Sequence, residues 1–331
     1  MPDMWFLIFI ICLALIFDFI NGFHDTANAI ATVVSTRVLS PFFAIAMAAG
    51  LNFLGAVSGT AVAKTIGSGI VGSSVSQEVV AAALIGATLW NLLTWYFGIP
   101  SSSSHALIGG LIGAGIASAG ASVVHWDTFF NKVFLPLVGS PVVGFFGAFL
   151  LMRFLLIICS YFSLGSVNNF FRRSQLLSSA FMAFSHGSDD AQKTMGIITL
   201  ALISAHKIPQ VPFNVPLWVI VLSATAMGLG TAGGGWRIIK TMGTRIFRLS
   251  PIHGFSAETT AAAIIEGASR FGIPLSTTHV IGSSIVGVGA SQRLNLVRWQ
   301  VVNHMIQAWI YTIPACGLLA YVSYVALRLF V

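Results

Sequence analysis

The chain has 331 residues, of which 56% are hydrophobic and only 8% are charged. A soluble protein of this length would carry about a quarter charged residues, so the composition excludes an ordinary soluble domain and indicates a polytopic membrane protein. The net charge of +7 does not indicate nucleic acid, because the basic residues are few and lie mostly between apolar segments, as the positive-inside rule describes.

Apolar segments of near-spanning length follow one another along the chain. A spanning helix needs about 17 to 25 apolar residues, and the hydropathy of the chain predicts about ten such segments. We therefore expect an all-α polytopic membrane fold. The expected segments are residues 4–35, 41–63, 79–97, 106–124, 133–162, 176–203, 215–235, 255–271, 280–290 and 301–329.

Polar residues and prolines interrupt several of these segments. The first is expected to break at Asn21 and the sixth at Ser185, while Gly-Ile-Pro junctions at residues 98–100 and 272–274 separate the third segment from the fourth and the eighth from the ninth. Broken helices are tolerated within a bilayer only where they are buried in protein or line a cavity. These breaks therefore predict the location of a functional site.

The chain contains an internal repeat. Phe-Gly-Ile-Pro-Ser-Ser-Ser-Ser-His at residues 97–105 matches Phe-Gly-Ile-Pro-Leu-Ser-Thr-Thr-His at residues 271–279. Upstream of these, the acidic stretch at residues 24–29 falls opposite the one at residues 189–194. Because the motifs recur in the same order, we predict that the chain is a duplicated unit.

An odd number of segments in each unit, about five, would give the second copy the opposite orientation in the membrane. We therefore predict two inverted-topology repeats, the first over residues 1–165 and the second over residues 166–331. Each Gly-Ile-Pro junction is either a link between two full crossings or the tip of a re-entrant hairpin. We favour hairpins, with the two tips meeting near the middle of the membrane.

The basic residues allow an orientation to be predicted. With odd parity in each half, they fall on one side of the membrane, which we assign to the cytoplasm. Both termini are then expected outside. These residues are Arg172 and Arg173 between the halves, the cluster Arg237, Lys240, Arg245 and Arg248, and the pair Arg293 and Arg298.

Each Gly-Ile-Pro junction is followed by a cluster of hydroxyl side chains and then by a small-residue helix. The proline sets up a first helical turn, where free N–H groups, hydroxyls and the positive end of the helix dipole converge. A small oxyanion would suit this arrangement, although hydroxyls in membrane helices also bond back to their own helix. The candidate ligands are Ser102, Ser103 and Ser104 in the first half, and Ser276, Thr277 and Thr278 in the second.

Asp25 and Asp190 are unexpected next to an anion. They fit a protonated anion such as hydrogen phosphate, whose hydrogen a carboxylate can accept, or a cation between them. The alternative is that both are neutral and only cap broken helices. Asn28 and Lys193 occupy equivalent places one turn further on, where Asn28 can bind a metal or the anion and Lys193 offers a fixed charge. Lys193 could instead extend to an interface.

Several other ionisable residues are candidates for carrying a proton or binding the coupling ion. Glu266 and Arg270 stand four residues apart, so they are expected to pair, although Arg270 is also close enough to a tip to be a phosphate ligand. The remaining candidates are His24, His105, His186, His279 and Glu258.

These motifs resemble those of the inorganic phosphate transporter (PiT) family. Residues 21–29 and 185–196 are similar to its two signature stretches, and residues 100–105 and 274–279 to its repeated hairpin motif. The resemblance spans nearly the whole chain and implies an inverted-repeat fold that imports phosphate with sodium or protons. By motif position it implies a site made of Asp25, Asn28, Ser102, Ser103, Ser104, Asp190, Ser276, Thr277 and Thr278.

The chain departs from the family pattern in the second half. Lys193 stands where sodium-coupled members tend to repeat the Asn of the first half, and Asp189 stands where Asn is common. Gln-Lys at residues 192–193 resembles bacterial members thought to use protons or to carry metal–phosphate complexes.

We therefore predict a secondary active symporter that imports inorganic phosphate, alone or as a metal–phosphate complex, across the plasma membrane by alternating access. Its coupling cation would be H⁺ or Na⁺, and we expect no other cofactor, no fixed metal site and no nucleic-acid partner. Its partners would be phosphate, the lipid bilayer and, as in relatives, a second copy in a homodimer.

Two other functions fit part of these motifs. A sulfate carrier would also use hydroxyls and helix ends, but sulfate has no proton to give to two carboxylates at neutral pH. An intramembrane metal-dependent hydrolase could be drawn from His24, Asp25, His186, Asp189 and Asp190. However, HExxH and a glycine-flanked nucleophile are missing from the sequence, so we do not expect an enzyme.

Overall fold

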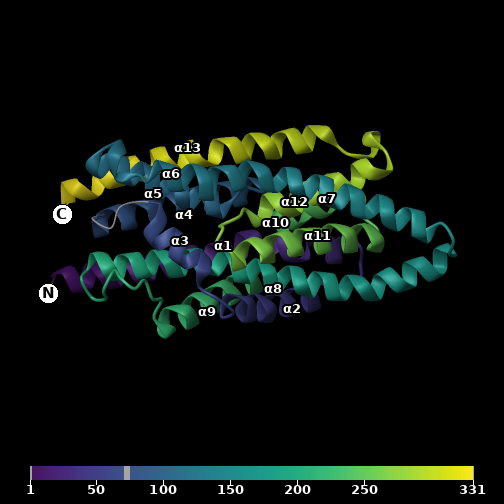
Figure 1. Cartoon of the computed structure of the whole chain (residues 1–331), viewed down its shortest axis with the longest axis horizontal. Coiled ribbons are helices and arrows are strands. Elements are labelled where there is room, and N and C mark those ends of the chain that lie inside the picture. The colour runs from purple at the N-terminus through teal and green to yellow at the C-terminus, as the bar shows by residue number, and fades with distance from the viewer. Residues whose placement is uncertain (1, 71–74, 331) are drawn as a thin grey trace.

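The regular structure of the chain is helical over residues 2–70 and 75–330, which are the residues described by the computed structural model (Figure 1). The expected all-α fold is confirmed. A π-helix, Phe129–Phe134, joins α6 to α7, and another, Thr241–Arg245, extends α10. The helices are α1 (Pro2–Ser35), α2 (Pro41–Ala56), α3 (Ala61–Gly69), α4 (Gln77–Phe97), α5 (Ser103–Ala119), α6 (Trp126–Thr128), α7 (Leu135–Cys159), α8 (Leu164–Ser204), α9 (Leu217–Gly233), α10 (Trp236–Lys240), α11 (Pro251–Arg270), α12 (Thr277–Gln292) and α13 (Trp299–Phe330).

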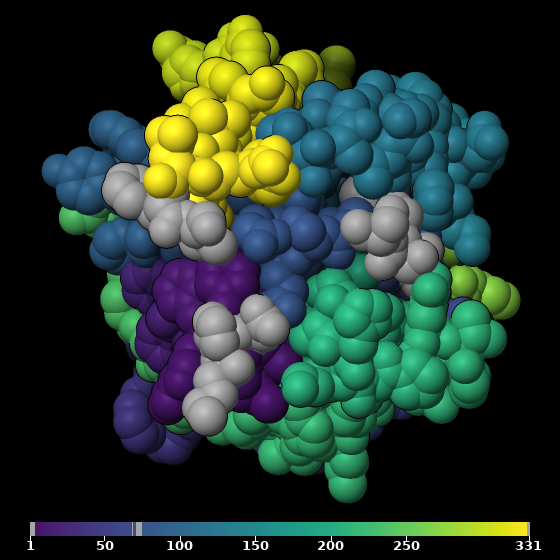
Figure 2. All heavy atoms as spheres, turned by 90° about the vertical axis from the view of Figure 1, so that its left-hand side faces the viewer, coloured from purple at the N-terminus to yellow at the C-terminus, as the bar shows by residue number. Residues whose placement is uncertain are grey.

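Both termini lie at one end of the molecule, on the left of Figure 1. Figure 2 shows that end face-on, with α1 in purple and α13 in yellow. Among the described residues, four helices are long and apolar enough to cross a membrane, and two bent pairs raise the number to as many as six. The four are Met4–Ser35, Gln77–Phe97, Trp126–Cys159 and Trp299–Leu329, and the pairs are α2 with α3 and α9 with the helix from Trp236.

The predicted breaks at Asn21 and Ser185 are wrong, because α1 and α8 pass through both positions as uninterrupted helices. Both helices stay continuous although Asn21 Oδ1 and Ser185 Oγ have no hydrogen-bond partner among the described residues, so a polar side chain alone does not interrupt the backbone hydrogen bonds. The breaks occur instead at residues 57–60, with a bend of 72°, and at residues 234–235, with a bend of 60°. Both fall in glycine-containing stretches that the apolar pattern had placed inside or at the edge of continuous segments.

Several basic residues lie on helices rather than in connections. α8 begins before Arg172 and Arg173, and both are exposed on its first turns. Arg237 belongs to α10, with its guanidinium 5.1 and 4.9 Å from the ring centres of Trp95 and Tyr96. Arg172, Arg173 and Arg237 thus lie between the predicted apolar segments, as expected, but on helical stretches rather than in loops.

Each Gly-Ile-Pro junction forms a tight turn between two packed helices, α4 with α5 and α11 with α12. Gly98 and Gly272 both have φ of +67°, a left-handed conformation that favours glycine at the end of a helix. The Gly98 carbonyl accepts a hydrogen bond from Thr241 at 2.9 Å, and that of Gly272 accepts one from Thr65 at 2.7 Å. Each bent helix therefore holds the hairpin of the other half of the chain.

Helices from the two halves cross at very close range through glycines. A Cβ added at Gly55 would lie 2.0 Å from a carbonyl oxygen of α8, and one at Gly187 would lie 2.1 Å from a carbonyl oxygen of α2. The crossing of α1 with α9 is similar. A Cβ added at Gly22 would lie 2.4 Å from a carbonyl oxygen of α9, and one at Gly230 would lie 2.0 Å from a carbonyl oxygen of α1. These crossings bring backbones together as small residues do in membrane helix packing.

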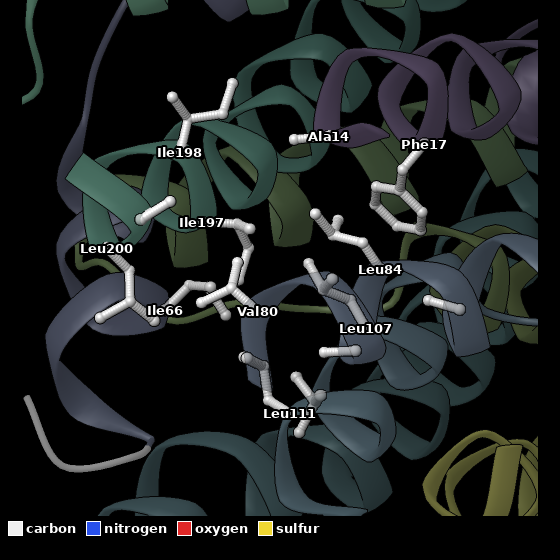
Figure 3. Packing of buried hydrophobic residues seen from close by; sticks show 14 of the residues in the cluster. Ala14, Phe17, Ile66, Val80, Leu84, Leu107, Leu111, Ile197, Ile198 and Leu200 are labelled. Carbon is white, nitrogen blue, oxygen red and sulfur yellow. The ribbon is translucent and has the colours of Figure 1, made fainter. Parts of the chain in front are cut away.

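Two hydrophobic cores lie on opposite sides of a buried polar layer. The first contains Ala14 and Phe17 of α1 with Ile197 and Leu200 of α8, together with parts of α3, α4 and α5 (Figure 3). The second contains the opposite ends of α1 and α8, together with α2, α7, α11 and α12. The polar residues between Phe17 and Ala27 of α1 are thus enclosed by apolar packing on both sides.

The close crossing of α2 and α8 predicts a site-specific effect on stability. Gly55→Ala is expected to lower the free energy of unfolding by about 1–3 kcal/mol, because the added methyl group overlaps the backbone of α8. Gly50→Ala is the matched control on the same helix, since a Cβ there meets no atom within 4 Å. Thermal unfolding in detergent measures both, and equal losses of stability would contradict this account of the crossing.

Candidate substrate site

The two hairpin tips begin their helices in the same way. Ser102 and Ser276 are N-caps, and their hydroxyl oxygens accept hydrogen bonds of 3.2 Å from the backbone N–H groups of His105 and His279. The two histidine rings meet at right angles with their centres 4.4 Å apart, so the tips of both halves lie together. Because the hydroxyls of Ser102 and Ser276 are already engaged in capping, the hydroxyls of the residues that follow them are better placed as ligands.

Lys193 joins both tips to α8. Its ammonium group donates to Ser104 Oγ at 2.5 Å on the first tip and to the carbonyl oxygen of Leu275 at 2.8 Å on the second. It also contacts Asp189 Oδ2 at 2.6 Å and pairs with Asp190. An ammonium has only three N–H donors, so these four acceptors compete for it.

The polar residues of α1 face the same tips. Asn28 donates from its amide to Thr277 Oγ1 at 3.2 Å and to Thr278 Oγ1 at 2.9 Å. Asp25 Oδ1 lies 2.6 Å from His24 Nδ1, and the other ring nitrogen of His24 lies 3.1 Å from the hydroxyl of Thr94. Asn28 therefore reaches the tip of the second half, as Lys193 of the second half reaches Ser104 of the first.

Asp25, His186 and Asp190 form a compact group between α1 and α8. Each offers one ligand atom, and these atoms all lie within 4.8 Å of one another. His186 Nε2 is 3.0 Å from Asp190 Oδ2, while His186 Nδ1 is 3.2 Å from the amide oxygen of Asn52. Two carboxylates and an imidazole are a ligand set that suits a divalent metal ion.

The cluster is closed off from solvent. Asp25, Asn28, Ser103, Asp190 and Lys193 are at most 3% exposed. Within the described part of the chain, Ser103 Oγ and Asn28 Oδ1 have no hydrogen-bond partner. The hydroxyl of Ser103 is thus free to bind a substrate oxygen.

A cavity of about 240 Å³ opens beside the cluster. Its lining includes Ser58 and Gly59 at the α2–α3 break, Gln192 of α8, and Arg270 of α11. Gln192 also accepts a hydrogen bond of 2.8 Å from the N–H of Val62, so it ties the start of α3 to α8. The α2–α3 break therefore lines one side of this cavity, whose wall includes Ser188 and Gln192, the chain neighbours of Asp189 and Lys193.

Two of the predicted candidates lie away from the cluster. Glu258 is fully buried and accepts hydrogen bonds from Thr32, Ser178 and Gln175, at a level one turn beyond Asn28 on α1. Arg270 pairs with Glu266 on its own helix, as the spacing predicts. The other candidates, including all four remaining histidines, belong to the cluster or touch it.

Sequence reasoning missed Asn52, Thr94 and Gln192. Asn52 is fully buried, orients His186 and donates to Thr231 Oγ1 at 2.7 Å. A single amide in the otherwise apolar segment 41–63 was a signal that could have identified it. Thr94 gave no such signal, because a threonine in a membrane helix commonly bonds to its own backbone, as Thr94 also does.

Buried ionisable groups midway along the helices of a multi-pass membrane protein mark a substrate or ion pathway. The fold and the paired tips place this chain among membrane transporters. It belongs to the phosphate transporter family, whose profile, described as "Phosphate transporter family", matches residues 21–320.

Relatives of known name agree over the full chain. The chain is 48% identical to the "Probable low-affinity inorganic phosphate transporter" of Bacillus subtilis, over 97% of each chain. It is 46% identical to a protein of the same description from Rhizobium meliloti, over 97% of this chain and 96% of the other. The solved structure described as "The sodium-dependent phosphate transporter" superposes with a TM-score of 0.89 at 27% identity, over 98% of this chain and 100% of that one. These relatives confirm the predicted transporter class.

The pairing of Lys193 with two buried aspartates predicts a large effect on stability. Lys193→Met is expected to lower the free energy of unfolding by about 3–5 kcal/mol, because it leaves buried carboxylates without their counter-charge. Combining it with Asp189→Asn is expected to recover part of that loss. Unfolding in detergent, followed for the single and double variants, measures the effect.

Arg270→Met is the matched control, since Glu266 and Arg270 are also an acid and a base on one helix. The Arg270 side chain is 72% exposed, so its loss is expected to cost less than about 1 kcal/mol. Equal losses for the two single variants would contradict a buried structural role for the Lys193 ammonium.

Proposed function

We propose that this protein is a secondary active symporter that imports inorganic phosphate together with a cation. The observation that carries the proposal is the meeting of the two Ser/Thr tips at one buried cluster that also contains Asp25 and Asp190. The tips supply donors to an anion, and the carboxylates supply acceptors. An anion that itself bears hydrogen satisfies both kinds of group, and so does an anion that arrives with a metal cation.

Hydrogen phosphate fits this mixture of groups. Ser103 and the first N–H groups of α5 and α12 donate to its unprotonated oxygens, while Asp25 or Asp190 accepts its O–H. Thr277 is already directed at Asp190, with 3.0 Å between Thr277 Oγ1 and Asp190 Oδ2. Sulfate would leave both carboxylates unmatched, so the cluster favours phosphate.

Alternating access would follow from two inverted repeats, residues 1–165 and 166–331. The reciprocal packing supports this, because α2 packs on α8 as α9 packs on α1, and α5 packs on α13 as α12 packs on α7. The reciprocal hydrogen bonds of Thr65 and Thr241 to the glycines of the opposite hairpin add to it. Movement of one hairpin relative to the other would open the shared site to one side at a time.

The coupling cation of this chain is proposed to be a proton. The position opposite Asn28 is occupied by Lys193, whose fixed positive charge already contacts Asp189 and Asp190. A resident ammonium takes the place that a second bound sodium ion would need. The named structural neighbour is sodium-dependent, so the two proteins would differ here.

Two forms of the cargo fit this proposal: free phosphate, and phosphate in a complex with a divalent metal. Asp25, His186 and Asp190 support the second form, because their ligand atoms are close enough to share one ion. The metal would then be part of the cargo, held beside the tips that bind the anion.

Asp25 and Asp190 are expected to be essential for uptake. Asp25→Asn or Asp190→Asn should abolish accumulation of radiolabelled phosphate in proteoliposomes, because an amide cannot accept the phosphate hydrogen with the same charge. The control is Asp127→Asn on α6, an exposed carboxylate far from the cluster in sequence. Gel filtration establishes that each variant is folded.

Imposed gradients test the coupling ion in the same vesicles. An inward proton gradient is expected to drive accumulation, whereas a sodium gradient alone is not. Accumulation under sodium only would contradict the assignment of the proton. Inhibition by sulfate as strong as that by unlabelled phosphate would contradict the assignment of the substrate.

Metal–phosphate uptake makes a separate prediction. Uptake is expected to rise when Mg²⁺ or Zn²⁺ is added, and His186→Ala should remove the rise while leaving metal-independent uptake measurable. His125→Ala provides the control, because this exposed histidine lies outside the cluster. Cotransport of radioactive zinc with phosphate is the direct measurement, and wild-type uptake that does not change when Mg²⁺ or Zn²⁺ is added would contradict the proposal.

A further inference from the structure

Asp18 is a buried carboxyl group that the proposed phosphate site does not use. It lies on α1 two turns before Asp25, about 10 Å away along the helix, and is 0% exposed. Within the described residues, neither of its carboxyl oxygens has a hydrogen-bond partner. Its neighbours in the chain, Ala14 and Phe17, point into the first hydrophobic core (Figure 3).

The polar groups closest to Asp18 are few and uncharged. The hydroxyl of Thr194 on α8 lies beside the carboxyl, where it can donate to the ionised group or accept from the protonated one. Asn21 is one turn further along α1 on the same face, and its amide oxygen is unpartnered among the described residues. A hydrogen added to Asp18 would therefore have an acceptor within reach.

The charged groups around Asp18 do not supply a counter-charge. Asp190 of α8 acts on it as a like charge, and His24 with Asp25 lies further along α1, toward the tips. Lys193 is turned toward Asp189 and both tips. α2 and α9 carry no ionisable side chain, α4 has only Glu78 in its first turn, and α10, α11 and α12 pack against the other half of α1.

We propose that Asp18 carries the coupling proton of the transport cycle, an inference that rests on the proposed function. An ionised carboxylate with no counter-charge and only a hydroxyl beside it is disfavoured in apolar surroundings, whereas the acid can donate its O–H to Thr194 or Asn21. The O–H bond forms with a proton taken from water on the outer side. It breaks when the reoriented protein returns that proton to water on the inner side.

A proton fits Asp18 better than a sodium ion does. Sodium sites in transporters draw on carbonyl oxygens of unwound helices, but α1 and α8 are continuous helices at this level, with their carbonyls engaged along the helix. Asp18, Asn21 and Thr194 alone would leave a sodium ion with few ligands. A proton needs only the Asp18 carboxylate to bind it and one neighbouring oxygen to accept the resulting O–H.

Asp18→Asn separates phosphate exchange from proton coupling. The amide is neutral at every pH and can donate to the same partners, so the variant should still exchange radiolabelled for unlabelled phosphate across vesicles at equal pH. Under an inward proton gradient in sodium-free buffer, however, it should not raise internal phosphate above the external concentration. Asp18→Glu keeps an acid and should still accumulate phosphate, with a displaced pH profile.

Asp127→Asn is the control and should accumulate phosphate as the wild type does. Gradient-driven accumulation by Asp18→Asn at the wild-type level would overturn the inference alone, leaving phosphate symport intact. If Asp18→Asn does not fold, an Asp18→Glu pH profile identical to that of the wild type would overturn it, and a displaced profile would support it. Wild-type vesicles that move no phosphate would contradict the proposed function itself.

Discussion

The structure depends on one buried ammonium group. Lys193 Nζ lies between Asp189 and Asp190 of its own helix and reaches Ser104 and Leu275 on the two tips. A buried charge is tolerated only with matched partners, so this ammonium fixes α8 and both hairpins relative to one another. Any opening of the site must therefore exchange some of these contacts, and an arriving anion is the partner best able to replace a carboxylate or a hydroxyl.

The two halves are alike in geometry but unequal in charge. Asn28 and Lys193 each reach the tip of the opposite half, yet one is a neutral amide and the other a cation. A neutral amide can release Thr277 and Thr278 at little electrostatic cost, whereas Lys193 cannot leave two carboxylates without a replacement for its charge. The contacts of the second tip with Asn28 are thus less costly to break than those of Lys193, and under the proposed alternating access the two openings of the site would differ in energy.

The sequence predicted the architecture better than the backbone details. Apolar length and the repeated Gly-Ile-Pro motifs located the helices and both tips, because these signals depend on local composition. The breaks at Asn21 and Ser185 were wrong because a buried polar side chain does not by itself interrupt the backbone hydrogen bonds of a helix, so α1 and α8 stay continuous. Glu258 was identified as buried and ionisable, but only the packing of Thr32, Ser178 and Gln175 around it shows that its acceptor capacity is already used.

The buried carboxyl groups lie at two levels along α1 and α8, and this separation bears on the proposed coupling of proton movement to phosphate movement. Asp25 and Asp190 lie where substrate would bind, while Asp18 lies nearer the end that carries both termini and faces α8 through Thr194. An anion at the tips and an ionised Asp18 would repel each other through a region of low dielectric constant, between two apolar cores. If Asp18 carries the coupling proton as proposed, loading of phosphate and neutralisation of Asp18 would favour each other without direct contact. Reciprocity would then require that a proton on Asp18 raise the affinity for phosphate as much as phosphate raises the affinity for the proton.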